Sequence, residues 1–273
     1  MVNVEILVIG NEILLGLVQD TNSNYLCQVV RELGGRVRQI TVVPDELDAI
    51  ANGLTGRLER GAELVFTCGG LGPTDDDMTL AAVAQATGRA TAVDPDARRL
   101  VERKYLELAR AGHVKSGDMS ESRRKMAQLP VGARMIPNPV GAAPAALLEV
   151  GGAHVISLPG VPTELKAIVE GPLQPVLAKL LGGGAYSKVE LTVNCGDESV
   201  LAPILRQAAT ANPNVYIKSR AAGFGPEEKF RITFSSSAAT VQETEEQIRA
   251  AVDDLSQLLA PEGITVAPET TAD

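Results

Sequence analysis

The stretch of residues 63–79, ELVFTCGGLGPTDDDMT, most constrains what this chain can fold into. It begins with a short apolar run, residues 64–66, that is typical of a strand buried on both faces of a sheet. Three glycines in four positions follow, and glycine lets a turn bring backbone N–H groups close to a ligand. Pro73 then favours a helix start, and we expect that helix to run to Gly88. A strand, a glycine turn and a helix in this order predict the anion-binding edge of an open α/β sheet.

Three carboxylates, Asp75, Asp76 and Asp77, lie in or just before the first turn of this expected helix. Acidic residues at such a position are often structural, because they complement the positive end of the helix dipole. They would repel a bare phosphate, unless a hard divalent cation such as Mg²⁺ lies between them and the phosphate groups. The density of glycines favours the functional interpretation, since an ordinary strand-to-helix connection does not need three of them.

The composition is that of a globular protein. Of 273 residues, 45% are apolar and 22% are charged, which suits one ordinary domain and a smaller one. A formal net charge of −9 without a run of Lys or Arg argues against a nucleic-acid partner. No apolar run reaches the length of a membrane span, and three widely spaced cysteines without a CxxC pair indicate a cytoplasmic protein with reduced thiols.

Strands and helices alternate along residues 1–182, which predicts an α/β domain with parallel strands joined by right-handed crossovers. We expect strands at 4–9, 37–43 and 64–66, and helices between them that are capped by Asn22 or Ser23 and by Asp45. Gly151 and Gly152 predict a hairpin between two further strands. One helix bent by its prolines is expected from 163 to about 181.

A run of three glycines at 182–184 has the composition of a linker. Beyond it, residues 186–260 show the order strand, helix, strand, strand, helix, which predicts a small separate α+β domain. Residues 261–273 are expected to be a tail.

Five segments together resemble one known family: GNEILLGLVQDTNSNYL, VPDE, TCGGLGPTDDDMT, NPVGAAPA and LPGVPTELK. They are similar to the MoaB/MogA-like molybdopterin-binding domain, and most of all to the N-terminal part of the competence/damage-inducible CinA family. The region beyond residue 186 resembles the KH-type domain of the same proteins. The C-terminal deamidase domain of full-length CinA has no counterpart in this sequence, so deamidation is not expected.

The resemblance implies a three-layer α/β/α sandwich with a mostly parallel sheet. For the CinA-like branch it also implies a homodimer with metal-dependent ADP-ribose pyrophosphatase activity. Carried over by motif, it assigns catalytic positions to Asp77, Asp45 and Glu12, and metal ligation to Asp77 and Asp76. The cofactor would be a divalent ion, Mg, Co, Mn or Ni, which neutralises phosphate charge and activates a water. The residues expected to bind the substrate are Gly69, Gly70, Gly72, Thr74, Asp20, Asn22, Arg124, Asn138, Gly141, Pro159 and Gly160.

Several of these residues have a structural alternative. Asp45 and Glu12 could equally be helix caps or residues that brace a loop, and Asp20 precedes a helix cap. The basic stretch 123–125 could be a solvated face instead of a phosphate contact. His154 begins a strand and is expected to be structural, and a Ser-His-Asp site is excluded because the sequence has no nucleophile elbow.

Two functions remain open at this stage. The first is hydrolysis of a small-molecule nucleotide pyrophosphate, with ADP-ribose ahead of FAD-like compounds, to give AMP and ribose 5-phosphate. The second is a pterin-binding or scaffold module without turnover. The acidic triplet beside the glycines favours the first, since a simple phosphate site would prefer Lys or Ser there.

Overall fold

The structure is a computed structural model that describes residues 2–221 and 230–268. The chain packs as two compact units. Unit 1 comprises Met1–Val30 and Gly35–Gly182, and unit 2 comprises Arg31–Gly34 and Gly183–Asp273. Within the described ranges, we find no helix with the length and apolarity that crossing a membrane requires.

Unit 1 is built on a six-stranded sheet in the order β2-β1-β3-β8-β7-β6. Its strands are β1 (Asn3–Ile9), β2 (Arg36–Val43), β3 (Leu64–Cys68), β6 (Arg134–Ile136), β7 (Ala145–Val150) and β8 (Ala153–Leu158). The strands β2, β1, β3 and β8 are parallel, whereas β7 pairs antiparallel with both β8 and β6. The predicted α/β fold with a mostly parallel sheet is therefore confirmed, and so is the hairpin at Gly151 and Gly152.

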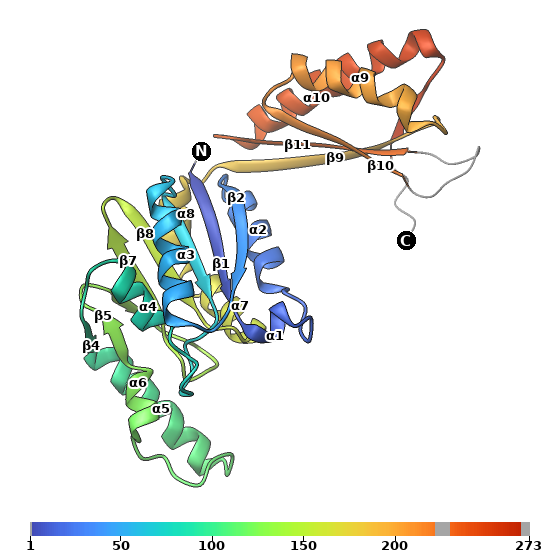
Figure 1. Ribbon diagram of the computed structural model, residues 1–273. Coiled ribbons are helices and arrows are strands. Elements are labelled where there is room, and N and C mark those ends of the chain that lie inside the picture. Colours follow the sequence, from blue (N-terminus) through green and yellow to red (C-terminus); the bar gives the residue numbers. More distant parts are fainter. Residues whose placement is uncertain (1, 222–229, 269–273) are drawn as a thin grey trace. The chain divides into compact units, whose positions relative to one another are not determined.

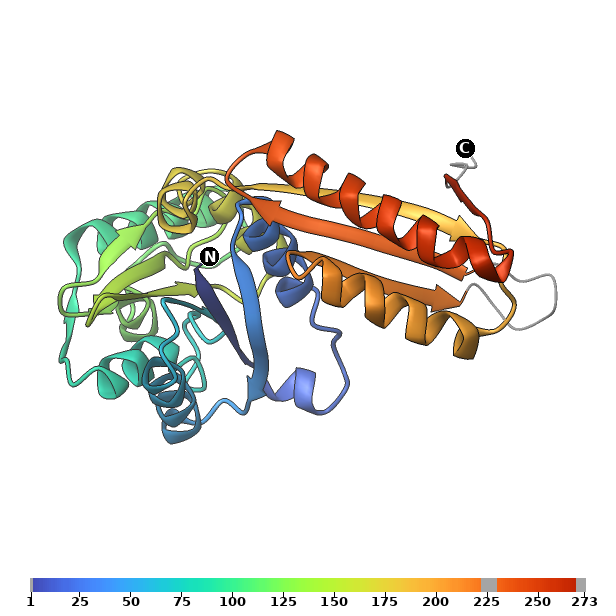
Figure 2. The same ribbon diagram turned by 90° about the horizontal axis from the view of Figure 1, so that it is seen from above.

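Helices cover both faces of this sheet (Figures 1 and 2). On one face, α3 (Leu47–Glu59) and α4 (Thr79–Ala86) share a core with Leu7 and Val65 of the central strands. Successive strand residues point to opposite faces, so the buried Ile6 and Phe66 face the other layer. That layer consists of α2 (Asn22–Glu32), α7 (Pro162–Glu170) and α8 (Gln174–Leu181). The three-layer arrangement follows from these two helix layers.

A smaller substructure lies beside the main sheet. Strands β4 (Thr91–Val93) and β5 (Gln128–Pro130) pair antiparallel, and α5 (Pro95–Arg110) and α6 (Glu121–Lys125) connect them. The helix α5 begins with a proline in its first turn after Asp94, whose side chain accepts hydrogen bonds from two backbone N–H groups. Its residue Val101 packs with Leu71 and Met126, which joins this substructure to the glycine turn.

The expected single helix over 163–181 is wrong. The helix α7 ends at Glu170, its C-cap is Gly171, and Pro175 lies in the first turn of a second helix, α8. Proline lacks the N–H that a helix interior needs, but it is tolerated in a first turn. Here it therefore begins a helix instead of bending one.

The expected helix caps are also wrong. The helix α2 is capped by Asp20, whose Oδ1 accepts the Ser23 N–H at 3.0 Å, so neither Asn22 nor Ser23 is the capping side chain. The helix α3 has Glu46 at its N-cap without a side-chain hydrogen bond, and Asp45 bonds elsewhere. Asp and Asn side chains compete for nearby N–H groups, and the sequence alone does not show which of them wins.

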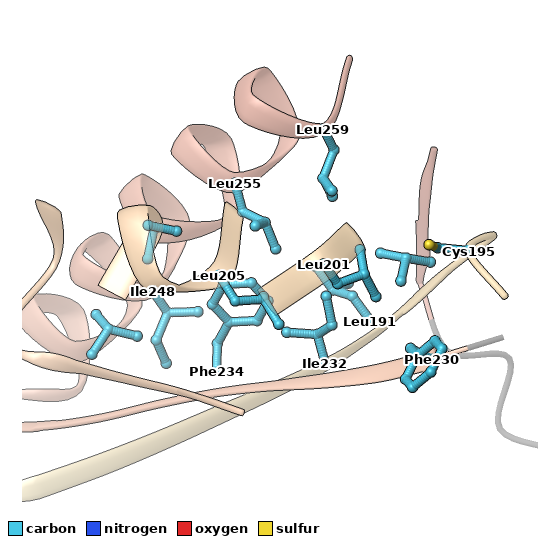
Figure 3. Close-up of a cluster of buried hydrophobic side chains, with 14 residues drawn as sticks. Leu191, Cys195, Leu201, Leu205, Phe230, Ile232, Phe234, Ile248, Leu255 and Leu259 are labelled. Atoms are coloured by element: carbon cyan, nitrogen blue, oxygen red, sulfur yellow. The ribbon is translucent and has the colours of Figure 1, made fainter. Parts of the chain in front are cut away.

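Unit 2 is an antiparallel sheet in the order β10-β11-β9-β12 with two helices. Its elements are β9 (Ala185–Val193), α9 (Glu198–Ala211), β10 (Val215–Ala221), β11 (Phe230–Ala238), α10 (Val241–Leu259) and β12 (Val266–Pro268). Figure 3 shows its core, in which Ile232 and Phe234 of the sheet pack with Leu205 and Ile248 of the helices. The predicted small α+β region is confirmed.

Part of the expected tail belongs to this sheet. Val266–Pro268 pairs antiparallel with β9, which corrects the expectation of a tail from residue 261. Ile264 and Val266 pack against the core of unit 2, and burying their apolar surface stabilises the edge strand. Residues 269–273 lie outside the described part of the chain.

Candidate functional site

A cleft of about 600 Å³ opens at the carboxyl-terminal edge of the parallel strands in unit 1. Ile9 is the last residue of β1, Gly69 directly follows β3, and Pro159 directly follows β8. All three line the cleft. The loops after parallel strands meet at one edge of a sheet, so residues far apart in sequence come together here.

Backbone conformation and close packing require glycine at two positions of the glycine turn, Gly69 and Gly70. Gly69 and Gly70 have φ angles of +109° and +68°, in the left-handed region. A Cβ on Gly69 would lie 2.3 Å from the Ile9 carbonyl oxygen, and a Cβ on Gly70 would lie 2.3 Å from Thr79 Oγ1. The turn is therefore packed too closely for any side chain.

Thr79 holds this turn and was missed by the sequence analysis. It is fully buried at the start of α4. Its hydroxyl donates to the Gly69 carbonyl at 2.8 Å, and its N–H donates to the Gly70 carbonyl at 3.1 Å. A threonine at a helix start is common in sequence as a helix cap, but the hydroxyl of Thr79 bonds to the glycine turn instead of capping α4.

The acidic triplet lies in the turn before α4, because the helix begins only at Thr79. Asp77 Oδ2 accepts hydrogen bonds from the N–H of Thr74 at 2.9 Å and from its hydroxyl. The same carboxylate lies over Gly72, where a Cβ would be 2.5 Å from Oδ2. The Thr74 hydroxyl, the backbone N–H of Asp76 and the charge of Lys125 lower the pKa of Asp76. Asp76 is therefore ionised at neutral pH.

Glu12 and Asp45 line the cleft from the side of β1 and β2. Asp45 Oδ2 accepts the N–H of Asn11 at 2.6 Å and so braces the short helix α1 (Asn11–Leu14). The exposed Glu12 on α1 places its carboxylate over Gly10, where a Cβ would lie 2.7 Å from Oε1. Asp45 thus has the loop-bracing contact that was one of its two alternatives, and the Glu12 carboxylate has no hydrogen-bond or ion-pair partner within residues 2–221 and 230–268.

The capacity of the site for a metal depends on how many protein ligands the ion needs. Within 2–221 and 230–268, no group of three or more His, Cys, Asp or Glu side chains could hold a metal ion. Mg²⁺ needs fewer, since it retains waters and is commonly held by one or two carboxylates together with substrate phosphates. Asp76 and Asp77, next to each other on the turn that faces the glycines, fit that donor set.

A side chain of α2 holds the loop that follows β8. Pro159 and Gly160 line the cleft, and the Asn22 side chain donates to the Gly160 carbonyl at 2.7 Å. Asn22 and Asp20 are not among the lining residues, and Asp20 caps α2 as described above. Asn22 therefore positions the loop and Asp20 stabilises the start of α2, and neither residue lines the cleft.

Asn138 organises a further loop. This buried amide accepts the N–H groups of Val140 and Gly141 and donates to the Ala143 carbonyl at 2.9 Å. Its Nδ2 also donates to Glu164 Oε2 at 2.7 Å. Asn138 and Gly141 lie behind the cleft wall, whereas Ala142, Ala143 and Glu164 line it.

Glu164, which lines the cleft, is a second residue of the site that was not predicted from the sequence. It is half-buried in the first turn of α7, and burial raises the pKa of its carboxyl, partly offset by Asn138 and Lys104. Glu164 belongs to the motif LPGVPTELK, but Pro159 and Gly160 of that motif were the residues predicted to bind the substrate. A carboxylate in a first helical turn is ordinary in sequence and is distinguished only by its burial.

The basic stretch lies next to the cleft and not in it. Arg124 lines a neighbouring depression together with Pro73 and Asp75. Arg123 stacks over the ring of Tyr105 at 3.9 Å, and Lys125 donates to the Thr74 carbonyl. Lys125 therefore holds the acidic turn, whereas Arg124 is exposed and does not line the cleft.

Comparison with known proteins identifies relatives along most of the chain. Residues 5–179 match the family model described as a probable molybdopterin binding domain. A protein of Pyrobaculum calidifontis is 39% identical over 255 residues, 93% of this chain and 94% of that protein. A CinA-like protein of Desulfosudis oleivorans is 41% identical over 66% of this chain and 42% of that protein. The crystal structure of the protein CinA, of unknown function, from Thermoplasma acidophilum is 37% identical, covers 64% of this chain and 97% of its own, and has a TM-score of 0.58.

Proposed function

Because the chain belongs to the family of probable molybdopterin-binding domains and has CinA-like relatives, we propose that it is a divalent-metal-dependent hydrolase of nucleotide pyrophosphates. The substrate we propose is ADP-ribose or a related compound, and the products of ADP-ribose are AMP and ribose 5-phosphate. One observation carries this proposal: a single cleft combines the glycine turn with five carboxylates, of which Glu12, Asp45, Asp76 and Asp77 follow the parallel strands β1, β2 and β3.

The division of labour follows from the chemistry. Splitting a pyrophosphate requires that charge on two neighbouring phosphoryl groups be neutralised and that a water be placed in line with the bond. The left-handed turn at Gly69 and Gly70 lets phosphate oxygens approach the backbone closely. Asp76 and Asp77 would hold the cation, which when bound neutralises phosphate charge and polarises the phosphoryl group.

Asp77 is suited to this role because Thr74 fixes its position before a ligand binds, and Gly72 leaves room for its carboxylate. Glu12, an exposed residue that lines the cleft from α1, is the carboxylate we assign to accepting a proton from the attacking water. Asp45 would act through the loop that carries Glu12, because its carboxylate bonds to the N–H of Asn11.

A module that binds a pterin or nucleotide without turnover is the second candidate. It is favoured by the absence, within residues 2–221 and 230–268, of three metal-ligating side chains in one group. In that case Asp77 would only brace its turn, and the cleft would hold a ligand without splitting it.

The test is release of AMP from ADP-ribose by the full chain, with Mg²⁺, Mn²⁺, Co²⁺ or Ni²⁺ and with a chelator. We expect equal amounts of AMP and ribose 5-phosphate with at least one metal and neither product with the chelator. ADP-ribose that binds but stays intact with all four metals would leave the binding module as the function. Sedimentation of the same sample tests the homodimer that we propose as its oligomeric state.

A further inference from the structure

One wall of the cleft differs in chemistry from the glycine turn. Tyr105, Met126, Ala142 and Ala143 line it and belong to one hydrophobic cluster. The carboxylate of Glu164 also lines the cleft and lies against Gly141, next to Ala142 and Ala143. An apolar wall and a carboxylate both disfavour a phosphate, because it would lose its hydration and meet a like charge. We therefore expect the part of a ligand that lies here to be uncharged.

The carboxylate of Glu164 is held by two residues that do not line the cleft. Asn138, which is 5% exposed, donates to Glu164 Oε2 at 2.7 Å. Gly141 leaves room for the carboxylate, because a Cβ there would lie 2.0 Å from Oε2. The second oxygen, Oε1, accepts no hydrogen bond within residues 2–221 and 230–268, which leaves it available to a ligand.

An ordinary helical role does not account for this arrangement. A carboxylate in a first helical turn often caps the free N–H groups, but α7 has no side-chain cap hydrogen bond. Glu164 bonds instead to an amide 26 residues earlier in the chain. It also does not belong to any group of three metal-ligating side chains in the described part of the molecule.

We propose that Glu164 is a specificity-determining residue that accepts a hydrogen bond from a hydroxyl of a ribose in the ligand. A carboxylate is the group that reads a ribose hydroxyl in dinucleotide sites, because it accepts hydrogen bonds and repels phosphate. This inference rests on the proposed function and deepens it. ADP-ribose carries one ribose on each side of its pyrophosphate, so a pyrophosphate on the glycine turn leaves either ribose to reach the wall with Glu164.

The experiment is a set of calorimetric titrations of the full chain with ADP-ribose, ADP and 2′-deoxy-ADP, all with the same metal. Each sample is checked for AMP afterwards. If the adenosine ribose is read, the wild type binds ADP about tenfold more tightly than 2′-deoxy-ADP; if the terminal ribose is read, it binds ADP-ribose about tenfold more tightly than ADP. Glu164→Gln is expected to lose most of whichever preference the wild type has.

Two further variants make the result specific to this carboxylate. Glu170→Gln is the matched control, since Glu170 lies on the same helix, is exposed, and bonds to Tyr25 away from the cleft. It should bind all three ligands as the wild type does. Gly141→Ala displaces the Glu164 carboxylate without removing its charge and should also lose the preference. If that variant fails to fold, Glu164→Gln still decides the question.

Two outcomes overturn the inference alone: a wild type that binds the ligands without any hydroxyl preference, or a preference that survives in Glu164→Gln. A wild type that binds none of the three ligands overturns the proposed function, and this inference with it. Melting temperatures of all variants, measured without ligand, show whether a lost preference reflects a lost fold.

Discussion

The two carboxylate oxygens of Asp77 differ in their hydrogen bonding. Its Oδ2 accepts the N–H and the hydroxyl of Thr74, while Oδ1 has no hydrogen-bond partner in the described ranges. Asp77→Asn keeps the shape and an acceptor for the N–H, but removes the charge that a cation needs. We expect turnover of ADP-ribose to fall about a hundredfold or more. The free energy of unfolding, measured in urea, should fall by less than about 1 kcal/mol.

Thr74→Ala is the control for this substitution. It removes the hydroxyl that braces Asp77 and keeps the charge, so turnover should fall much less than in Asp77→Asn. If Asp77 only braces the turn, Asp77→Asn instead keeps its activity and its metal dependence, and both variants lose similar amounts of stability.

The raised pKa of Glu164 gives a stability prediction with a definite sign. Burial holds this carboxyl above its ordinary value of 4.5 in the folded state, so the folded protein binds the proton more tightly than the unfolded chain. Ionised Glu164 therefore lowers stability at neutral pH, and this cost disappears as the pH falls through the folded pKa and below the ordinary value. Glu164→Gln should melt at or above the wild-type temperature at pH 7, and that gain should be absent at about pH 4.

Thermal melts of the two proteins at both pH values check this. A Gln variant that is less stable by the same amount at pH 7 and pH 4 would show that packing, and not the ionised carboxylate, dominates at this position.

The site residues were predictable from sequence where a motif follows a strand. Glu12, Asp45 and Asp77 each come shortly after a parallel strand, and the structure brings them to one cleft, while their roles stay predictions. Thr79 and Glu164 were not predictable, because a threonine and a glutamate at helix starts are ordinary in sequence. Their partners, Gly69 and Asn138, come from other elements and appear only in the folded chain.

At the scale of elements, the connection between β3 and α4 works as one rigid turn. Gly70 and Gly88 flank α4 and have similar φ angles, +68° and +63°. A Cβ on Gly70 would lie 2.3 Å from Thr79 Oγ1, whereas a Cβ on Gly88 would meet nothing within 4 Å. Gly88→Ala should cost about 1 to 2 kcal/mol of unfolding free energy from backbone strain alone.

Gly70→Ala adds a steric term to that strain. It should cost about 1 to 3 kcal/mol more than Gly88→Ala, because the Thr79 hydroxyl must leave the buried Gly69 carbonyl. It should also weaken binding of ADP-ribose, which Gly88→Ala should not. Urea unfolding and calorimetry measure both effects, and equal losses in the two variants would show that the turn tolerates a side chain.

The ends of helices were not predictable from the sequence where contacts with other parts of the fold decide them. Pro73 suggested a helix that begins at the acidic triplet, but α4 begins at Thr79 because that residue's N–H and hydroxyl bond back to the glycine turn. Proline patterns around residue 175 are equally compatible with a kink and with a new helix. The choice depends on how α7 and α8 pack, which is a tertiary property.

At the scale of the molecule, the net charge of −9 is a sum over the chain and does not give the charge of any one surface. In unit 2, Lys218 and Arg220 alternate along β10 with Ile217 and Ser219, which face the helices. These cations therefore lie on the sheet face that points away from the core, and this face is locally positive although the net charge of the chain is negative. For this reason, the sequence-based expectation that the protein does not bind nucleic acid stays a prediction.

The two units have separate cores, and the cleft belongs entirely to unit 1. Its lining runs from Ile9 to Glu164, and the core of unit 2 is formed by residues 191–259. A fragment of residues 1–182 should therefore fold alone and hydrolyse ADP-ribose with the KM and kcat of the full chain. Calorimetry of the full chain should show two transitions, one of them at the melting temperature of the fragment, because separate cores unfold as separate cooperative units. A folded fragment without activity would instead show that unit 2 contributes to the site, and a single transition would show that the units unfold together.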